Sequence, residues 1–104
     1  MNLLRVPVYR NPNLLRLAAK APKCFCCGRD NDGTVVACHS NEQTMGKGMG
    51  IKAADVVAYC CATCHEEIDG RNSLLTPYQR KSQWAMAATR SIRWALENHP
   101  EVFR

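Results

Sequence analysis

The sequence predicts a small α+β fold in which a helix, a β-hairpin and two further helices follow one another. Two short segments rich in β-branched residues, 34–38 and 55–60, predict the two strands. Residue patterns typical of helix starts lie before and after them. The chain of 104 residues has the size of one domain and contains neither an internal repeat nor a low-complexity segment. We therefore expect residues 1–104 to form a single domain.

The first predicted helix starts at an Asn-Pro pair. Asn11 is a favourable N-cap residue, and Pro12 suits the first helical position, where its missing N–H is not needed. Pro22 is expected to end the helix. The apolar face consists of Leu14, Leu15, Leu17 and Ala18. Residues 1–23 contain five Lys or Arg and no acidic residue, so this segment is predicted to be a basic helical arm.

The two strand segments read TVVAC and DVVAYC. Strands that follow each other in sequence usually pair, and an antiparallel hairpin is the simplest arrangement. Its connection is long and contains a glycine-rich stretch, GKGMG, at 46–50.

Two helices are predicted after the hairpin. Thr63 followed by Glu66 has the pattern of a capping box, and Gly70 is a typical residue at a helix end. A second capping box at Thr76 predicts a long helix that runs to about Asn98. The apolar stripe of the long helix consists of Trp84, Ala88, Ile92 and Ala95.

Charge is distributed unevenly along the chain, which has a formal net charge of +5. Residues 24–69 contain three basic and seven acidic residues, whereas residues 70–104 contain six basic and two acidic residues. Basic flanks around an acidic centre suit a polyanion such as nucleic acid, although the same charges can simply keep a protein in solution. No apolar run is long enough for an export signal or a membrane span, so we expect a cytoplasmic protein without a membrane partner.

Seven cysteines are clustered between residues 24 and 64, unlike the spread-out, even-numbered set of a secreted disulfide framework. Two C-x-x-C pairs occur among them. Each pair can turn its sulfurs to one point, and two pairs complete a tetrahedral zinc site. The predicted ligands of this structural zinc are Cys24, Cys27, Cys61 and Cys64. Cys26 and Cys60 remain outside this set, although a shifted register that uses them also fits the spacing.

Two alternatives compete with zinc at these cysteines. They can simply be buried as small apolar residues. The segment from Cys61 to His65 also matches the c-type haem attachment pattern. Haem attachment requires export and leaves Cys24 and Cys27 without a role, so the sequence favours zinc.

Three further residues suggest a second metal site with a catalytic base. His65 and Asp69 are four residues apart and share one helical face, so they can bind one divalent cation. His39 ends the first predicted strand and is expected to come near His65 when the cysteine pairs meet. A neutral imidazole near a cation can activate water for attack on a phosphate. A surface histidine beside an acidic neighbour is the alternative for His65.

This combination resembles the HNH, or ββα-metal, nuclease superfamily. More narrowly, the chain resembles the small prophage-encoded nucleases of the YbcO type, which are related to the RecA-dependent nuclease Ref. The matching features are LLRLAAKAPKC, His39, the glycine- and lysine-containing stretch through Lys52 and Asp55, and CATCHEEID. They extend from about Leu14 to Arg71, and the C-terminal helix matches only in kind.

The resemblance implies a zinc-stapled, HNH-like DNA endonuclease of phage or prophage origin. His39 would be the general base, and His65 and Asp69 would hold a catalytic Mg²⁺ or Mn²⁺. The four cysteines of the two pairs would hold structural zinc, and a recombinase filament is a candidate partner. The domain would comprise a basic arm at 1–23, a core at 24–70 and a C-terminal helix at 71–104.

Two residues depart from the HNH pattern. Cys38 stands where many HNH enzymes have an Asp or His that also binds metal, so the catalytic cation either lacks a ligand or is zinc-like. Asp55 stands in the segment where the middle asparagine is expected, and Asn41 is the nearest asparagine.

Nucleic-acid contacts are predicted in the glycine-rich stretch, where the backbone can approach phosphates. Lys47, Lys52 and Arg71 are the candidate phosphate ligands, although the stretch can also be merely a flexible loop. The alternative function is a non-catalytic, zinc-stapled DNA-binding or adaptor module. Redox or metal-handling roles of the remaining cysteines form a third class.

Overall fold

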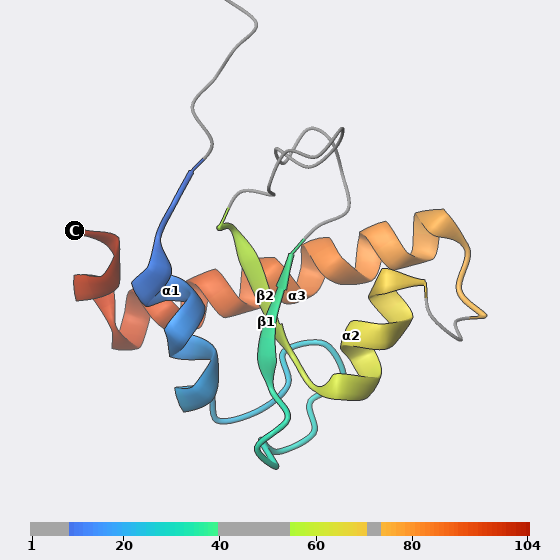
Figure 1. Cartoon of the computed structure of the whole chain (residues 1–104), viewed down its shortest axis with the longest axis horizontal. Coiled ribbons are helices and arrows are strands. Elements are labelled where there is room, and N and C mark those ends of the chain that lie inside the picture. The colour runs from blue at the N-terminus through green and yellow to red at the C-terminus, as the bar shows by residue number, and fades with distance from the viewer. Residues whose placement is uncertain (1–8, 40–54, 71–73) are drawn as a thin grey trace, which may run out of the picture.

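The computed structural model describes residues 9–39, 55–70 and 74–104 (Figure 1). These residues form an α+β fold with a two-stranded hairpin and three α-helices, as the sequence predicts. The elements are α1 (Pro12–Arg16), the 3-10 helix η1 (Leu17–Lys20), β1 (Val36–His39), β2 (Val57–Cys60), α2 (Ala62–Asp69), α3 (Pro77–Asn98) and the 3-10 helix η3 (Pro100–Phe103).

The predicted start of α1 is confirmed. The Oδ1 of Asn11 accepts a hydrogen bond from the Leu14 amide at 3.1 Å, and Pro12 occupies the first turn. The α-helix tightens into η1 at Leu17 and ends at Lys20. Ala21 is extended because a following proline disfavours the helical conformation.

Both strands are shorter at their starts than the sequence predicts. Thr34 belongs to a turn, in which its amide and hydroxyl both donate to Asp32 Oδ1 at 3.0 and 2.6 Å. The Asp55 amide donates to the Tyr9 carbonyl at 2.9 Å rather than to β1. The remaining residues pair antiparallel, and His39 lies opposite Val57. The prediction that His39 ends the first strand is confirmed.

The predicted capping box at Thr63 is wrong. The helix α2 begins at Ala62, directly after β2, and Cys61 is its N-cap without a side-chain hydrogen bond. Because Cys61 is fixed at the end of a buried strand, the strand decides where the helix starts. Gly70 ends α2 in the left-handed conformation, with a φ of 84°, as predicted.

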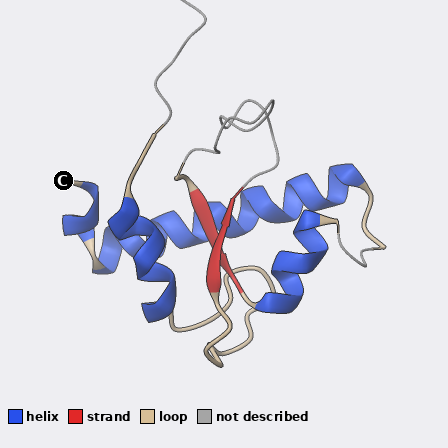
Figure 2. Ribbon diagram, in the orientation of Figure 1, coloured by secondary structure: helices blue, strands red, loops and turns tan. Residues whose placement is uncertain are grey.

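The long helix α3 runs behind the hairpin and covers it (Figure 2). Its predicted capping box is confirmed. The Thr76 hydroxyl and the Gln79 side chain each accept a hydrogen bond from the backbone N–H of the other residue. The Ser91 hydroxyl accepts the Tyr59 amide at 2.9 Å and thereby anchors β2 to α3. The buried residues of α3 are Trp84, Ala87, Ala88, Ser91 and Ala95, whereas Ile92 is only half-buried.

Among the described residues, no helix combines the length and the apolar character needed to span a bilayer.

Candidate metal centres

The first candidate centre consists of the four cysteines of the two C-x-x-C pairs. Their sulfurs all lie within 4.8 Å of one another, and the Sγ atoms of Cys27 and Cys61 are 3.9 Å apart. Zn–S bonds of about 2.3 Å in a tetrahedron place sulfurs about 3.8 Å apart. The cluster comprising Cys24, Cys27, Cys61 and Cys64 therefore fits a structural zinc ion.

The first cysteine pair has the backbone of a metal-binding turn. The amides of Cys26 and Cys27 both lie 3.4 Å from the Cys24 Sγ and donate to it. Gly28 follows with a φ of 83°, and its amide donates to the Cys24 carbonyl at 2.9 Å. Burial raises the pKa of Cys24, but backbone N–H groups, chiefly those of Cys27 and Cys61, outweigh burial and lower this pKa to about 7. The lowered pKa favours the thiolate form of Cys24, which is the form that binds metal.

The pKa of Cys64 is shifted in the opposite direction from that of Cys24. Burial, and then the negative charge of Cys26 and a hydrogen bond with Cys61, raise the pKa of the Cys64 thiol. Several sulfurs this close together cannot all ionise, because their charges repel one another. A bound dication removes this repulsion and allows all four to be thiolates.

The second candidate centre consists of Cys38, His65 and Asp69. Their ligand atoms also lie within 4.8 Å of one another. The His65 Nε2 and Asp69 Oδ2 are 3.2 Å apart on one face of α2, as their spacing predicts. Cys38 comes from β1 and is fully buried, whereas the His65 side chain is 35% exposed. The residue that the sequence marks as a departure thus lies beside both predicted ligands.

His39 is held by a different partner. Its Nε2 lies 3.3 Å from the Oδ1 of Asp55, which is buried. The backbone N–H of Asn11 donates a hydrogen bond to the other carboxylate oxygen of Asp55, Oδ2, at 2.9 Å. The Arg10 Nη1 lies 3.8 Å from Asp55 Oδ1. Burial raises the pKa of Asp55, but the Asn11 amide, His39 and Arg10 together lower it below its usual value.

An ionised Asp55 determines which nitrogen of neutral His39 carries the proton. A carboxylate only accepts hydrogen bonds, so the Nε2 of His39 must donate. The Nδ1 atom is then the basic nitrogen and can accept a proton. Within the described residues, His39 belongs to neither ligand cluster.

The two cysteines outside both clusters, Cys26 and Cys60, form hydrogen bonds with each other and with one cysteine of each cluster. Hydrogen bonds with Cys26 and Cys38, followed by burial, raise the pKa of Cys60, so this thiol stays protonated. Conversely, the hydrogen bond from Cys60 is the main cause that lowers the pKa of Cys26 to about 6. Cys60 therefore acts as a thiol donor to its neighbours.

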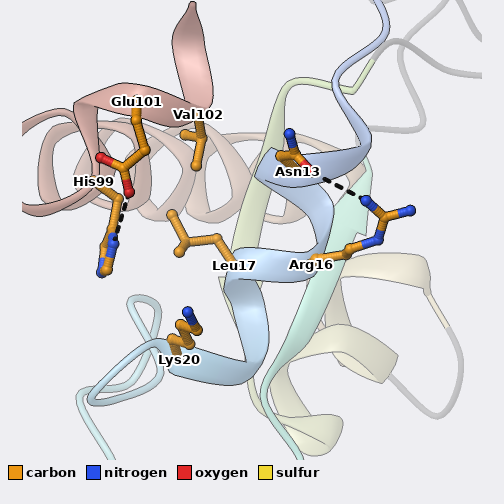
Figure 3. Close-up of a pocket in the computed structure, with 7 residues that line it drawn as sticks. All are labelled: Asn13, Arg16, Leu17, Lys20, His99, Glu101 and Val102. Atoms are coloured by element: carbon orange, nitrogen blue, oxygen red, sulfur yellow. Dashed lines mark hydrogen bonds and ion pairs between the residues drawn. The ribbon is translucent and has the colours of Figure 1, made fainter.

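A pocket of about 410 Å³ lies between α1, η1 and η3 (Figure 3). Arg16, Lys20 and His99 contribute positive or titratable groups to its lining. The Arg16 Nη1 donates to the Asn13 Oδ1 at 3.0 Å, and His99 Nδ1 is 3.4 Å from Glu101 Oε1. Two of these three side chains, Arg16 and His99, therefore already have partners within the pocket lining.

The predicted phosphate contacts lie outside the described residues. These are Lys47, Lys52 and Arg71, together with the glycine-rich stretch at 46–50. Asn41, the asparagine nearest to the expected middle asparagine of the HNH pattern, also lies outside the described residues.

The comparisons with known proteins point to one family. A family model described as "Putative nuclease YbcO" matches residues 13–99. This range contains both candidate metal centres and the His39–Asp55 pair. No curated protein and no solved structure gave a significant match to the chain.

Proposed function

Because the chain belongs to the YbcO family of putative nucleases, we propose that it is a metal-dependent DNA endonuclease with an HNH-like, ββα-metal core. The order β1, β2, α2 supports this proposal. The observation that carries it is the pairing of His39 with Asp55, whose carboxylate is ionised and buried. His39 directly follows Cys38, which belongs to the same ligand cluster as His65 and Asp69.

In the proposed reaction, the Nδ1 of His39 accepts a proton from a water molecule. The resulting hydroxide attacks the scissile phosphorus as one P–O ester bond breaks. A divalent cation held at His65 and Asp69 would stabilise the negative charge on the phosphate and on the leaving oxygen. The tetracysteine centre would take no part in these steps. Its role would be structural, because it would fasten α2, which carries His65 and Asp69, to the turn that contains Cys24 and Cys27.

Asp55 is proposed to position His39. Its carboxylate accepts a hydrogen bond from the Nε2–H of His39 and another from the backbone N–H of Asn11, so the ring and its tautomer are fixed. The Asn11 Nδ2 also donates to the Val102 carbonyl at 2.7 Å. The position of the base therefore depends on both the N-terminal segment and η3.

Asp55→Asn is expected to lower the cleavage rate while preserving the shape of the site. An amide can present its NH₂ group to Nε2, which favours the tautomer with the proton on Nδ1. The expected loss lies between about tenfold and the full 10²–10⁴-fold contribution of a general base. Single-turnover plasmid nicking measures it, with zinc content and circular dichroism as controls. A wild-type rate in Asp55→Asn would remove Asp55 from the mechanism.

DNA binding is proposed to use basic residues that include Lys47, Lys52 and Arg71. Such phosphate contacts carry no base information, so binding should tolerate any sequence. Lys47→Ala combined with Lys52→Ala should weaken binding and reduce the slope of log K against log salt by about 2, since each lost phosphate contact contributes about 0.9. Fluorescence anisotropy at several salt concentrations measures this slope. An unchanged slope would show that neither lysine contacts phosphate.

The proposal is tested by nicking of supercoiled plasmid by the wild-type protein with Mg²⁺, Mn²⁺, Co²⁺ or Zn²⁺. Duplex DNA, single-stranded DNA and DNA coated with a recombinase should be compared, because a recombinase filament remains a candidate partner. Cleavage that depends on an added cation is the expected result. Binding without cleavage under every condition would instead favour the non-catalytic DNA-binding or adaptor module, which the replacement of an Asp or His by Cys38 also suggests.

A further inference from the structure

We propose that Cys38 binds the same cation as His65 and Asp69, so that the second centre is a thiolate–imidazole–carboxylate site for Zn²⁺-class ions rather than for Mg²⁺. The catalytic use of this site rests on the proposed nuclease function, but ion binding does not.

The geometry of the three side chains supports a shared ion. Their ligand atoms lie within 4.8 Å of one another, and those of His65 and Asp69 are 3.2 Å apart. Zinc bonds of about 2.0–2.3 Å require ligand atoms about 3.3–3.8 Å apart in a tetrahedron. The three atoms can therefore reach one ion with small rotations of their side chains.

The position of Cys38 is fixed by the core. Cys38 pairs with Ala58 in the hairpin, and the Cys38 carbonyl accepts a hydrogen bond from the buried Trp84 Nε1–H at 2.9 Å. Its Sγ lies 3.8 Å from the His39 carbonyl oxygen, near the long limit for sulfur, so this contact is weak. The Cys60 thiol also forms a hydrogen bond with Cys38, and a Cys38 thiolate can accept this bond while it binds an ion, so ion binding breaks no strong hydrogen bond.

The exposure of the three residues leaves one side of the site open. Cys38 is fully buried, whereas the side chains of His65 and Asp69 are 35% and 20% exposed. An ion held by all three would lie at the boundary between core and solvent. Three protein ligands with a solvent-facing fourth position are typical of catalytic zinc, because that position can take water or a phosphate oxygen.

The ligand types decide the class of ion. Mg²⁺ prefers six oxygen ligands in nearly octahedral geometry, and a thiolate is a poor ligand for it. Zn²⁺ and Co²⁺ accept sulfur, nitrogen and oxygen together in tetrahedral sites. One sulfur, one nitrogen and one carboxylate oxygen therefore favour Zn²⁺ or Co²⁺ over Mg²⁺.

The test is a Co²⁺ titration of full-length protein that already contains one zinc in its tetracysteine centre. Co²⁺ bound by a thiolate gives a charge-transfer band in the near ultraviolet. We expect one further Co²⁺ per chain to bind with this band, and excess Mg²⁺ to leave it unchanged. Cys38→Ala should lose the band and bind Co²⁺ at least about 100-fold more weakly, because even outer-shell changes cost 10–100-fold in affinity. Cys26→Ser is the matched control and should keep the band.

A measurement on the wild-type protein covers the case in which Cys38→Ala does not fold. X-ray absorption at the zinc edge of protein with two zinc ions should show five sulfur ligands shared by the two ions, against four if Cys38 is only a buried apolar residue. Four sulfurs, or an unchanged cobalt band in folded Cys38→Ala, would overturn the inference. Five sulfurs in a protein that cuts no DNA would contradict the nuclease proposal alone. Equal Mg²⁺-dependent cleavage by wild type and Cys38→Ala would contradict this inference alone.

Discussion

Cys61→Ser is expected to unfold the protein. The Cys61 sulfur lies 3.9 Å from that of Cys27, and the residue joins β2 to α2, so it connects the two halves of the tetracysteine centre. Structural zinc supplies on the order of 10 kcal/mol or more to folding. The whole stability of a typical domain is about 5–15 kcal/mol, so loss of the ion should remove most or all of it.

Far-ultraviolet circular dichroism and zinc content per chain measure this outcome. Cys26→Ser provides a matched control, because Cys26 lies in the same turn but outside the tetracysteine cluster. It should retain the fold and the tightly bound zinc. Removal of zinc from the wild type by a strong chelator should unfold it as Cys61→Ser does. A folded wild-type protein that contains no zinc would disprove the structural role of the ion.

His39→Ala is expected to abolish most cleavage without affecting the fold. A positioned general base contributes about 10²–10⁴-fold to a reaction rate, and this variant removes the proton acceptor itself. Zinc content, cation binding and DNA affinity should stay at their wild-type values, since His39 lies in neither ligand cluster of the described residues.

The dependence on cation concentration separates the base from the metal ligands. His65→Ala and Asp69→Ala should bind the catalytic cation more weakly, so a higher concentration of Mn²⁺ or Zn²⁺ should restore part of their activity. No concentration of cation should restore His39→Ala, because a cation does not replace a proton acceptor. The nicking rates of the three variants across a cation titration provide the measurement. Wild-type cleavage by His39→Ala would refute its role as the base.

Signals confined to one turn of the chain were sufficient to predict much of the fold. The helix starts at Asn11 and Thr76 depend on hydrogen bonds to residues three positions away, so they can be read from the sequence. The tetracysteine cluster was predictable for the same reason, because each C-x-x-C pair is a local unit. At Thr63 the local pattern was misleading, because the buried strand that ends at Cys60 decided where the helix begins.

The second centre and its neighbours depend on contacts between distant segments. The sequence identified Cys38 as an exception but could not place its sulfur beside His65, since this depends on how β1 packs against α2. The Asp55 carboxylate that contacts His39 likewise accepts a hydrogen bond from the backbone N–H of Asn11, in a segment 44 residues earlier in the chain. Only the folded arrangement of these segments reveals such pairs.

The helix α2 carries adjacent residues of the two candidate centres, Cys64 and His65. Successive residues of an α-helix are rotated by about 100° around its axis, so the angular phase of α2 fixes the direction of each side chain. One residue inserted between Cys64 and His65 would leave the tetracysteine cluster in place and turn His65 and Asp69 away from Cys38. An insertion of seven residues, close to two full turns, would restore the direction but displace the pair by about 10 Å along the axis. The spacing between these two residues is therefore constrained at the level of single codons, so that insertions and deletions at this junction should be far more harmful than most substitutions.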